Sequence, residues 1–165
     1  MIQTKLTATA PTICLTQEEY QSVLQRQVQL THGQFDQTLL IHVDLSATNG
    51  VNDINSDIST RFYQAFQAIV NKEHVNEAGL IYHQQVWNKK EVGYRLTLLL
   101  NRAAYPDVSN HGTTGLSLIS NIEKAWGTAI DGNVNKLIGK VIFPTNPIHV
   151  LNNKIRDVHP LTSYQ

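Results

Sequence analysis

The chain is 165 residues long, which is enough for one compact domain with a buried core. Its 41% hydrophobic content excludes global disorder, and its 13 basic residues are balanced by 13 acidic ones. This neutrality argues against a broad basic surface that follows a nucleic-acid backbone, although charges can still segregate to one face. A lone cysteine, Cys14, excludes an internal disulfide framework and a metal site made only of cysteines.

The N-terminal sequence has no continuous apolar segment of the kind found in signal peptides. No run of ~18 apolar residues predicts a membrane span. We therefore expect a soluble, cytoplasmic protein with a flexible N-terminal segment over residues 1–11 and a single domain over residues 12–165. Cys14 is expected to lie in a mobile segment, which gives it little weight as a nucleophile.

The first half of the chain predicts a helix, a strand and a second helix. Thr16 followed by Glu19 forms a capping box, and apolar residues at helical spacing follow it. The next segment, 38–47, alternates as a strand that places His42 and Asp44 on one face. The strongest helical pattern runs over residues 53–74, with Asp53 as the expected N-cap and one stripe of apolar residues (Ile54, Ile58, Phe62, Phe66 and Ile69).

The second half predicts two strands, a helix and a last strand region. Residues 79–88 and 93–101 are rich in strand-forming residues, and "NKKEVG" between them suits a hairpin turn. A helix follows over residues 113–130, and the strand region 139–151 is broken by two prolines, which favours an edge position. This order predicts an α+β sandwich, in which helices pack on a mainly antiparallel sheet.

Three polar pairs on the predicted strands are candidate sites. His42 and Asp44 share a strand face at a spacing that suits a metal or a proton relay, but also a solvent-facing or mutually satisfied pair. In the next strand only one of Tyr82 and His83 shares a face with Gln85 and Trp87. The histidine there is either a ligand or a hydrogen-bonded structural residue. At the third pair, Tyr94–Arg95, the arginine either contacts a phosphate or partner carboxylate or extends its side chain from a strand end towards solvent.

The remaining polar candidates, His149, His159 and Tyr164, lie in irregular sequence and are assigned no role. The phosphate-binding loops, nucleophile elbow, zinc-protease motif and paired cysteine motif of common enzyme classes are all missing.

Several segments together resemble the inovirus-type replication initiator family, with its YagK–YfjJ C-terminal domains, within the HUH endonuclease superfamily. The resemblance covers roughly Thr38 to Leu151, through "LLIHVDLS", "STRFYQAF", "LIYHQQVWNKK" and above all "GYRLTLLLNRAAY". The last segment corresponds to a family stretch of the form His-Tyr-His, an apolar strand, Leu-Leu-Leu-Asn and then Tyr. The resemblance implies an HUH-like α+β domain related to ferredoxin and RRM folds.

The departures from the family pattern bear on activity. The family's two metal-binding histidines correspond here to Gly93, which has no ligand atom, and Arg95, a cation that would repel a metal ion. A Tyr-x-x-Lys motif is missing after the last strand, and Tyr164 is not on a plausible helix. The resemblance therefore implies a retained scaffold without its metal and nucleophile, which argues against an enzyme and predicts no cofactor.

Three functions follow from this interpretation. The first is binding of single-stranded or hairpin DNA, through phosphate contacts and base stacking by six residues (Trp87, Lys89, Lys90, Tyr94, Arg95 and Arg102). The second is a phage-encoded inhibitor that binds a host defence protein complex, comparable to anti-CRISPR proteins, with exposed Tyr63, Tyr105 and Trp87 as anchors. The third is a residual nuclease with a rearranged metal site built from His42, Asp44 and His83. The oligomeric state is left open.

Overall fold

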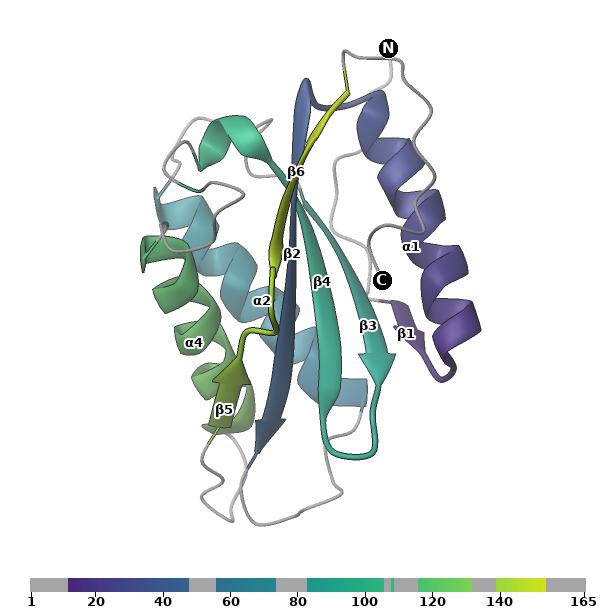
Figure 1. Cartoon of the computed structure of the whole chain (residues 1–165). Helices are drawn as coiled ribbons and strands as arrows, with labels where there is room; N and C mark the ends of the chain where they lie inside the picture. The colour runs from purple at the N-terminus through teal and green to yellow at the C-terminus, as the bar shows by residue number, and fades with distance from the viewer. Residues whose placement is uncertain are drawn as a thin grey trace.

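The structure is a computed structural model that describes residues 12–47, 56–73, 83–105, 108, 116–131 and 139–153. Within these ranges the chain forms an α+β fold in which a six-stranded sheet is covered by helices, as the sequence predicts (Figure 1). In chain order the elements are β1 (Thr12–Cys14), α1 (Gln17–His32), β2 (Gln37–Ala47), α2 (Ser56–Glu73), β3 (His83–Lys89), β4 (Tyr94–Asn101), a 3₁₀ turn (Arg102–Ala104), α4 (Leu116–Asp131), β5 (Gly139–Ile142) and β6 (Ile148–Asn152).

The sheet has the strand order β1-β3-β4-β2-β5, and β6 also pairs with β2. All neighbours are antiparallel except β1, which runs parallel to β3. The predicted hairpin between β3 and β4 is confirmed, and it closes with a hydrogen bond of 3.0 Å from the Lys90 N–H to the Gly93 carbonyl. The predicted last strand region is two strands, β5 and β6, because Pro144 and Pro147 interrupt it; both strands pair with β2.

The start of α1 follows the predicted cap. The Thr16 hydroxyl accepts a hydrogen bond of 3.1 Å from the Glu19 N–H, which satisfies one of the unpaired donors of the first turn. The Glu19 carboxylate accepts in return from the Leu15 N–H at 2.9 Å, one residue before the usual partner in a capping box. The apolar side of this helix buries Tyr20, Leu24 and Val28.

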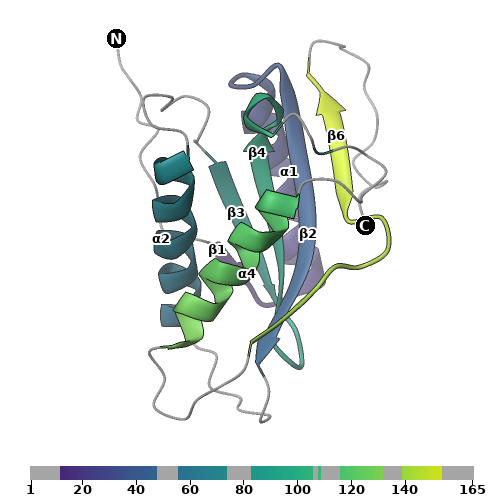
Figure 2. The same ribbon diagram turned by 90° about the vertical axis from the view of Figure 1, so that its left-hand side faces the viewer.

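The two faces of the sheet carry different layers. Helices α2 and α4 cover one face, where alternate residues of β2 and β4 form the larger core (Figure 2). Phe62 of α2 contacts both Trp87 of β3 and Trp126 of α4, with ring centroids 5.5 and 6.4 Å apart. Helix α1 covers part of the other face over a smaller core that includes Leu40, Val86 and Leu99. The polar candidates on β2 and β4 therefore lie on the face of α1.

The N-terminal strand was not predicted, and it corrects the expectation for Cys14. Residues 12–14 add a short parallel strand at the edge of the sheet, with Cys14 opposite Asn88. The Cys14 side chain is completely buried rather than part of a mobile segment. Burial and the charge of Glu19 raise the pKa of its thiol, against a smaller lowering by Arg26.

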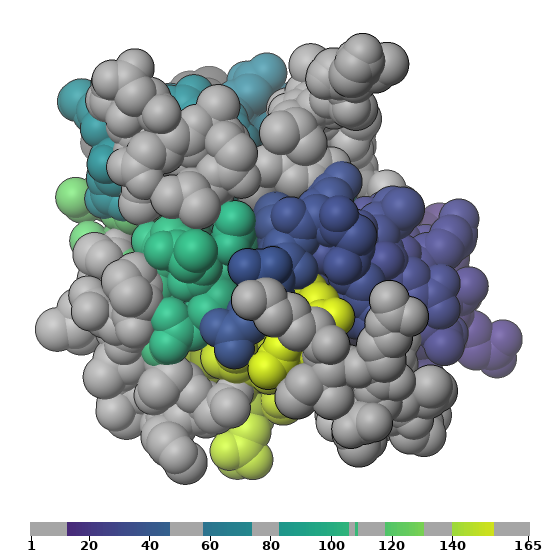
Figure 3. Space-filling view, turned by 90° about the horizontal axis from the view of Figure 1, so that it is seen from above, coloured from purple at the N-terminus to yellow at the C-terminus, as the bar shows by residue number. Residues whose placement is uncertain are grey.

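The end of β6 is attached to the connection between α1 and β2, where the two segments lie together in the view from above (Figure 3). The Asn153 N–H donates to the Asp36 carbonyl at 2.9 Å, and its side-chain amide donates to the Thr38 hydroxyl at 2.8 Å. These bonds hold β6 beside β2 at this end of the sheet.

Several predicted features lie outside the described residues. These are the segment 1–11, the Asp53 cap with Ile54, the candidate Tyr82, and the C-terminal residues His159 and Tyr164. Within the described helices, none is long and apolar enough to cross a membrane.

Candidate nucleic-acid interface

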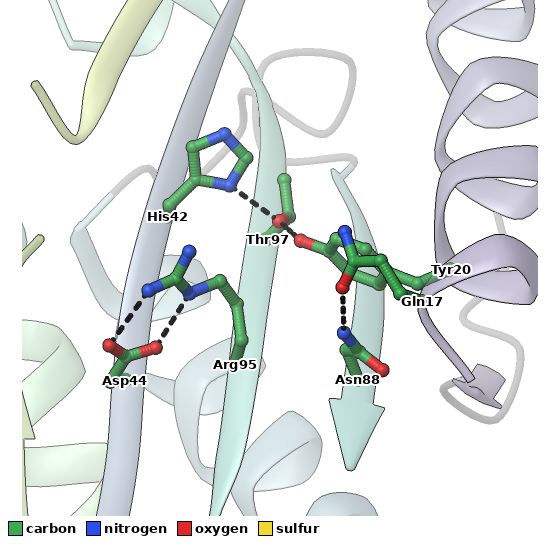
Figure 4. Close-up of polar contacts among 7 residues, drawn as sticks. All are labelled: Gln17, Tyr20, His42, Asp44, Asn88, Arg95 and Thr97. Atoms are coloured by element: carbon green, nitrogen blue, oxygen red, sulfur yellow. Dashed lines mark hydrogen bonds and ion pairs between the residues drawn. The ribbon is translucent and has the colours of Figure 1, made fainter. Parts of the chain in front are cut away.

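A line of polar side chains crosses the sheet beside α1 (Figure 4). Asp44 of β2, Arg95 of β4 and Asn88 of β3 are direct cross-strand neighbours, since Asp44 pairs with Arg95 and Arg95 with Asn88. Gln17, the first residue of α1, extends the line by accepting a hydrogen bond of 2.9 Å from the Asn88 amide. We call Asp44, Arg95, Asn88 and Gln17 the polar row.

Arg95 and Asp44 form a two-pronged ion pair at the centre of the polar row. Arg95 Nε donates to Asp44 Oδ1 at 2.6 Å, and Arg95 Nη2 donates to Asp44 Oδ2 at 2.9 Å. Their side chains are 30% and 37% exposed, so a partner can reach both of them. The hydrogen bond to Asp44 is the main cause of the raised pKa of Arg95, which stays charged at every physiological pH.

A second group, the buried polar cluster of Tyr20, Thr97 and His42, lies one step along the strands. The Thr97 hydroxyl bonds to His42 Nδ1 at 2.7 Å and to the Tyr20 hydroxyl, which joins α1 to β4 and β2. His42 is 7% exposed, and its Nε2 has no hydrogen-bond partner among the described residues. In Figure 4 this Nε2 points away from Arg95. The His42 ring packs edge-on against the ring of His149 in β6, with the two ring centroids 5.7 Å apart.

Both ionisable members of this cluster are neutral at physiological pH. Burial, the neighbouring His149 and the charge of Arg95 lower the pKa of His42 to about 4. Burial raises the pKa of Tyr20 to about 12, against a smaller lowering by the bond to Thr97. The cluster therefore acts as a neutral hydrogen-bonded connection, while the charges of this face belong to the polar row and its surroundings.

Basic side chains flank the polar row at the hairpin end of the sheet. Lys90 is exposed there. Lys89 is exposed too, but it pairs with Tyr94 and lies on the other face of the sheet, with its ammonium 5.3 Å from the centre of the Tyr94 ring, so it does not belong to this group. On the other side of β2, exposed Lys140 of β5 pairs with Ser46. Arg102 is separated from this group, because it follows the opposite end of β4, roughly 20 Å along the strand from Arg95. It donates instead to the Tyr105 carbonyl at 3.0 Å.

The aromatic candidates are buried, which contradicts their expected exposure. Trp87 is 0% exposed and Tyr94 is 3% exposed, so neither ring face is available for a base. Tyr63 and Tyr105 are 8% and 7% exposed, so they and Trp87 are not surface anchors. The physical reason is their position on the face of α2 and α4, where large rings fill the core.

The rearranged metal site predicted from His42, Asp44 and His83 does not form. His83 pairs with Leu100 and faces the core under α2, where it stacks on Tyr63 at 5.1 Å. His42 faces the opposite side of the sheet, and β4 lies between their strands. In the described ranges, no three or more His, Cys, Asp or Glu residues come together as a possible metal site.

Gly93 and Arg95, where the sequence resemblance would place metal-binding histidines, offer no ligand to a divalent ion. Arg95 brings a positive charge that is already paired with Asp44. Gly93 has a positive φ of 77°, and a Cβ there would lie 2.1 Å from the Leu45 carbonyl oxygen. The backbone at this position thus leaves no room for a side chain.

The sequence does not predict several other residues of the site. Gln17, Asn88 and Thr97 are common polar residues in ordinary positions, and only the strand register and the placement of α1 bring them together. Lys140 was overlooked because nothing in the sequence indicates that β5 pairs beside Asp44. The alternation of β2 and β4, in contrast, correctly placed Asp44, His42, Arg95 and Thr97 on matching strand faces.

Comparison with known proteins identifies a family for this chain. In the searches of curated proteins and of solved structures, nothing matches the chain significantly. The family model of the YagK/YfjJ C-terminal domain matches residues 5–163, which is nearly the whole chain and includes every described residue of the polar row. The chain therefore belongs to the YagK/YfjJ C-terminal domain family.

Proposed function

We propose that this protein acts by binding single-stranded or hairpin DNA along the polar row, without cutting it. The observation that carries the proposal is the Arg95 side chain at the centre of the row, which is 30% exposed, with exposed Lys90 and Lys140 on either side of it at the hairpin end of the sheet. The resemblance to replication initiators of phages and mobile elements supports DNA as the ligand. The misfit of Gly93 and Arg95 to a metal ion supports binding rather than cleavage.

Phosphate contacts carry the affinity in this proposal. Arg95 offers a planar set of N–H donors that suits phosphate oxygens, and Lys90 and Lys140 add positive charge beside it. Trp87 and Tyr94 do not stack on bases in this proposal, because both rings are buried. We therefore expect little preference for base sequence, since phosphate contacts position a strand but do not identify it.

Fluorescence anisotropy with a labelled single-stranded oligonucleotide tests the proposal across a range of salt concentrations. For the wild type we expect binding that weakens steeply as salt rises, because counterions are released from the strand. Arg95→Ala should lower the slope of log affinity against log salt by about 0.7, the value for one phosphate contact on a single strand. Lys124→Ala is the control, since Lys124 is an exposed cation on α4 at the other face of the sheet.

Two outcomes contradict the proposal. The first is no binding by the wild type at low salt. The second is cleavage of the oligonucleotide that appears only when manganese is added, since this would show that the protein holds a catalytic metal despite the misfit of Gly93 and Arg95.

A specific feature of the surface favours a protein partner as the second candidate. Leu15, Val92 and Ile142 are 72%, 68% and 55% exposed, and they lie towards the hairpin end of the sheet, spread from the β1 edge to the β5 edge. Leu30, also 55% exposed, lies apart from them near the end of α1. Exposed apolar side chains at one end of a domain can contribute to a protein-binding surface. In this case a partner such as a host defence complex would bind with weak dependence on salt, and Val92→Ser would weaken binding while Arg95→Ala would not.

A further inference from the structure

Asp44 occupies one edge of the Arg95 guanidinium, an edge that a DNA phosphate can also use. Two of the five guanidinium N–H groups bond to its two carboxylate oxygens, at 2.6 and 2.9 Å. A phosphate presents a pair of oxygens with the same spacing to the same fork. The carboxylate and a phosphate therefore cannot use this edge of Arg95 at the same time.

We infer that the Arg95 fork is a phosphate site that Asp44 fills in the free protein, and that a backbone phosphate replaces Asp44 when DNA binds. This inference rests on the proposed function. The carboxylate acts as an internal competitor: it keeps Arg95 in a defined position, and it opposes the binding of a second anion. Affinity for DNA is therefore lower than the basic side chains alone would give.

The surroundings allow the exchange to occur without unfolding. Both side chains are about one-third exposed, so water can solvate each charged group when the ion pair separates. Their backbones are fixed in the β2–β4 pairing, which means that only side-chain torsions need to change. Two titratable neighbours of the pair, His42 and Tyr20, are neutral at physiological pH and add no charge that would hold Asp44 in place.

The charges near the pair also favour an incoming anion once Asp44 is displaced. Ile142 and Asn88 are the uncharged neighbours of the pair along the same line of the sheet. Lys140 and Lys90 lie on the hairpin side of this line, and both are exposed. Arg95 and Lys140 are the cations that the strand register places on the same face as Asp44, while Lys90 and the acidic Glu91 are both exposed in the adjacent hairpin. Removal of the Asp44 charge should therefore strengthen phosphate binding.

Asp44→Asn tests the inference, because it removes the charge and keeps the size of the side chain. At low salt we expect this variant to bind the labelled oligonucleotide about two- to fivefold more tightly than the wild type, the effect of one partly exposed ion pair. Glu123→Gln is the matched control: it removes the same charge from an exposed position on α4, at the other face of the sheet. Circular dichroism of both variants checks that they are folded.

A second measurement uses inorganic phosphate in place of DNA. In ¹H–¹⁵N spectra, the Arg95 Nε–H signal should shift as phosphate is added, and it should saturate at a lower phosphate concentration in Asp44→Asn than in the wild type. If the wild type binds the oligonucleotide but Asp44→Asn binds no more tightly than Glu123→Gln, the inference is wrong and the proposed function stands. If no variant binds the oligonucleotide while phosphate shifts the Arg95 signal as expected, the phosphate site stands and the proposed DNA function is wrong. If neither ligand responds to the loss of Asp44, the inference is overturned.

Discussion

Gly93 lies directly against the main chain of Leu45, so closely that a Cβ on Gly93 would come within 2.1 Å of the Leu45 carbonyl oxygen. Its φ of +77° is a conformation that favours glycine. The hairpin between β3 and β4 therefore depends on a residue without a side chain at the point where it touches β2. Any residue with a side chain at this position would require a different local backbone.

Gly93→Ala should lower the free energy of unfolding by roughly 2–4 kcal/mol, because both the positive φ and the contact with Leu45 oppose a side chain. Urea denaturation followed by tryptophan fluorescence measures the change. Gly127→Ala is the matched control, since a Cβ at this position of α4 meets nothing within 4 Å. The control should be neutral or stabilising by up to about 1 kcal/mol, the helix preference of alanine over glycine. Equal stability of Gly93→Ala and the wild type would refute the packing argument.

Thr97→Val should destabilise the fold by about 1–3 kcal/mol, because it leaves buried polar atoms of both His42 and Tyr20 without their partner. Valine keeps the shape of threonine, so the loss reflects the hydroxyl rather than a cavity. The double variant Tyr20→Phe/Thr97→Val also removes the Tyr20 hydroxyl that Thr97→Val leaves without a partner. Its loss of unfolding free energy should therefore be smaller than the sum of the losses in the two single variants. Strict additivity in urea denaturation would show that the Thr97 hydroxyl does not connect α1 to the sheet.

The stability of the protein should fall as the pH decreases from about 6.5 to about 4, partly because of His42. Its pKa is about 4 in the folded protein, against an ordinary value of 6.5, so the unfolded chain binds more protons between these values. The contribution is fully present above pH 6.5 and is lost progressively below it, on the order of 3 kcal/mol in total. Half-buried His149, whose pKa is also lowered by burial, acts in the same direction.

Thermal or urea unfolding at a series of pH values measures this dependence. His42→Asn removes the titrating group, so its unfolding free energy should vary less than that of the wild type between pH 4 and 6.5. His32→Gln, which removes an exposed imidazole from the end of α1, is the control variant. A wild type and a His42→Asn variant with the same slope in this window would rule out His42 as the cause.

The sequence predicts most of the fold because its strongest signals are local. The capping pair Thr16 and Glu19, the alternation along β2 and the glycine in the "NKKEVG" turn each determine their element through nearby residues. β1 was missed because three residues are too short to show a period, and its pairing with β3 depends on a parallel contact far along the chain.

The candidate site was only partly predictable for a related reason. Alternation places Asp44 and Arg95 each on one face of its own strand, but the register that sets them opposite each other is a long-range property. Aromatic residues such as Trp87 and Tyr94 suit either a stacking surface or a core. Which of the two they form is decided by α2 and α4, which cover that face.

Cys14 should react with a thiol reagent only when β1 leaves the sheet. The side chain is 0% exposed and the pKa of its thiol is raised, so little of the reactive thiolate is present and no reagent can reach it. We expect slow labelling by Ellman's reagent in native buffer and rapid labelling in denaturing urea. A Cys14→Ser/Leu15→Cys variant is the control, because the next residue is 72% exposed and should label quickly in native buffer. If native Cys14 labels as fast as a cysteine at position 15, β1 is open in solution, and the short strand contributes little to holding the edge of the sheet.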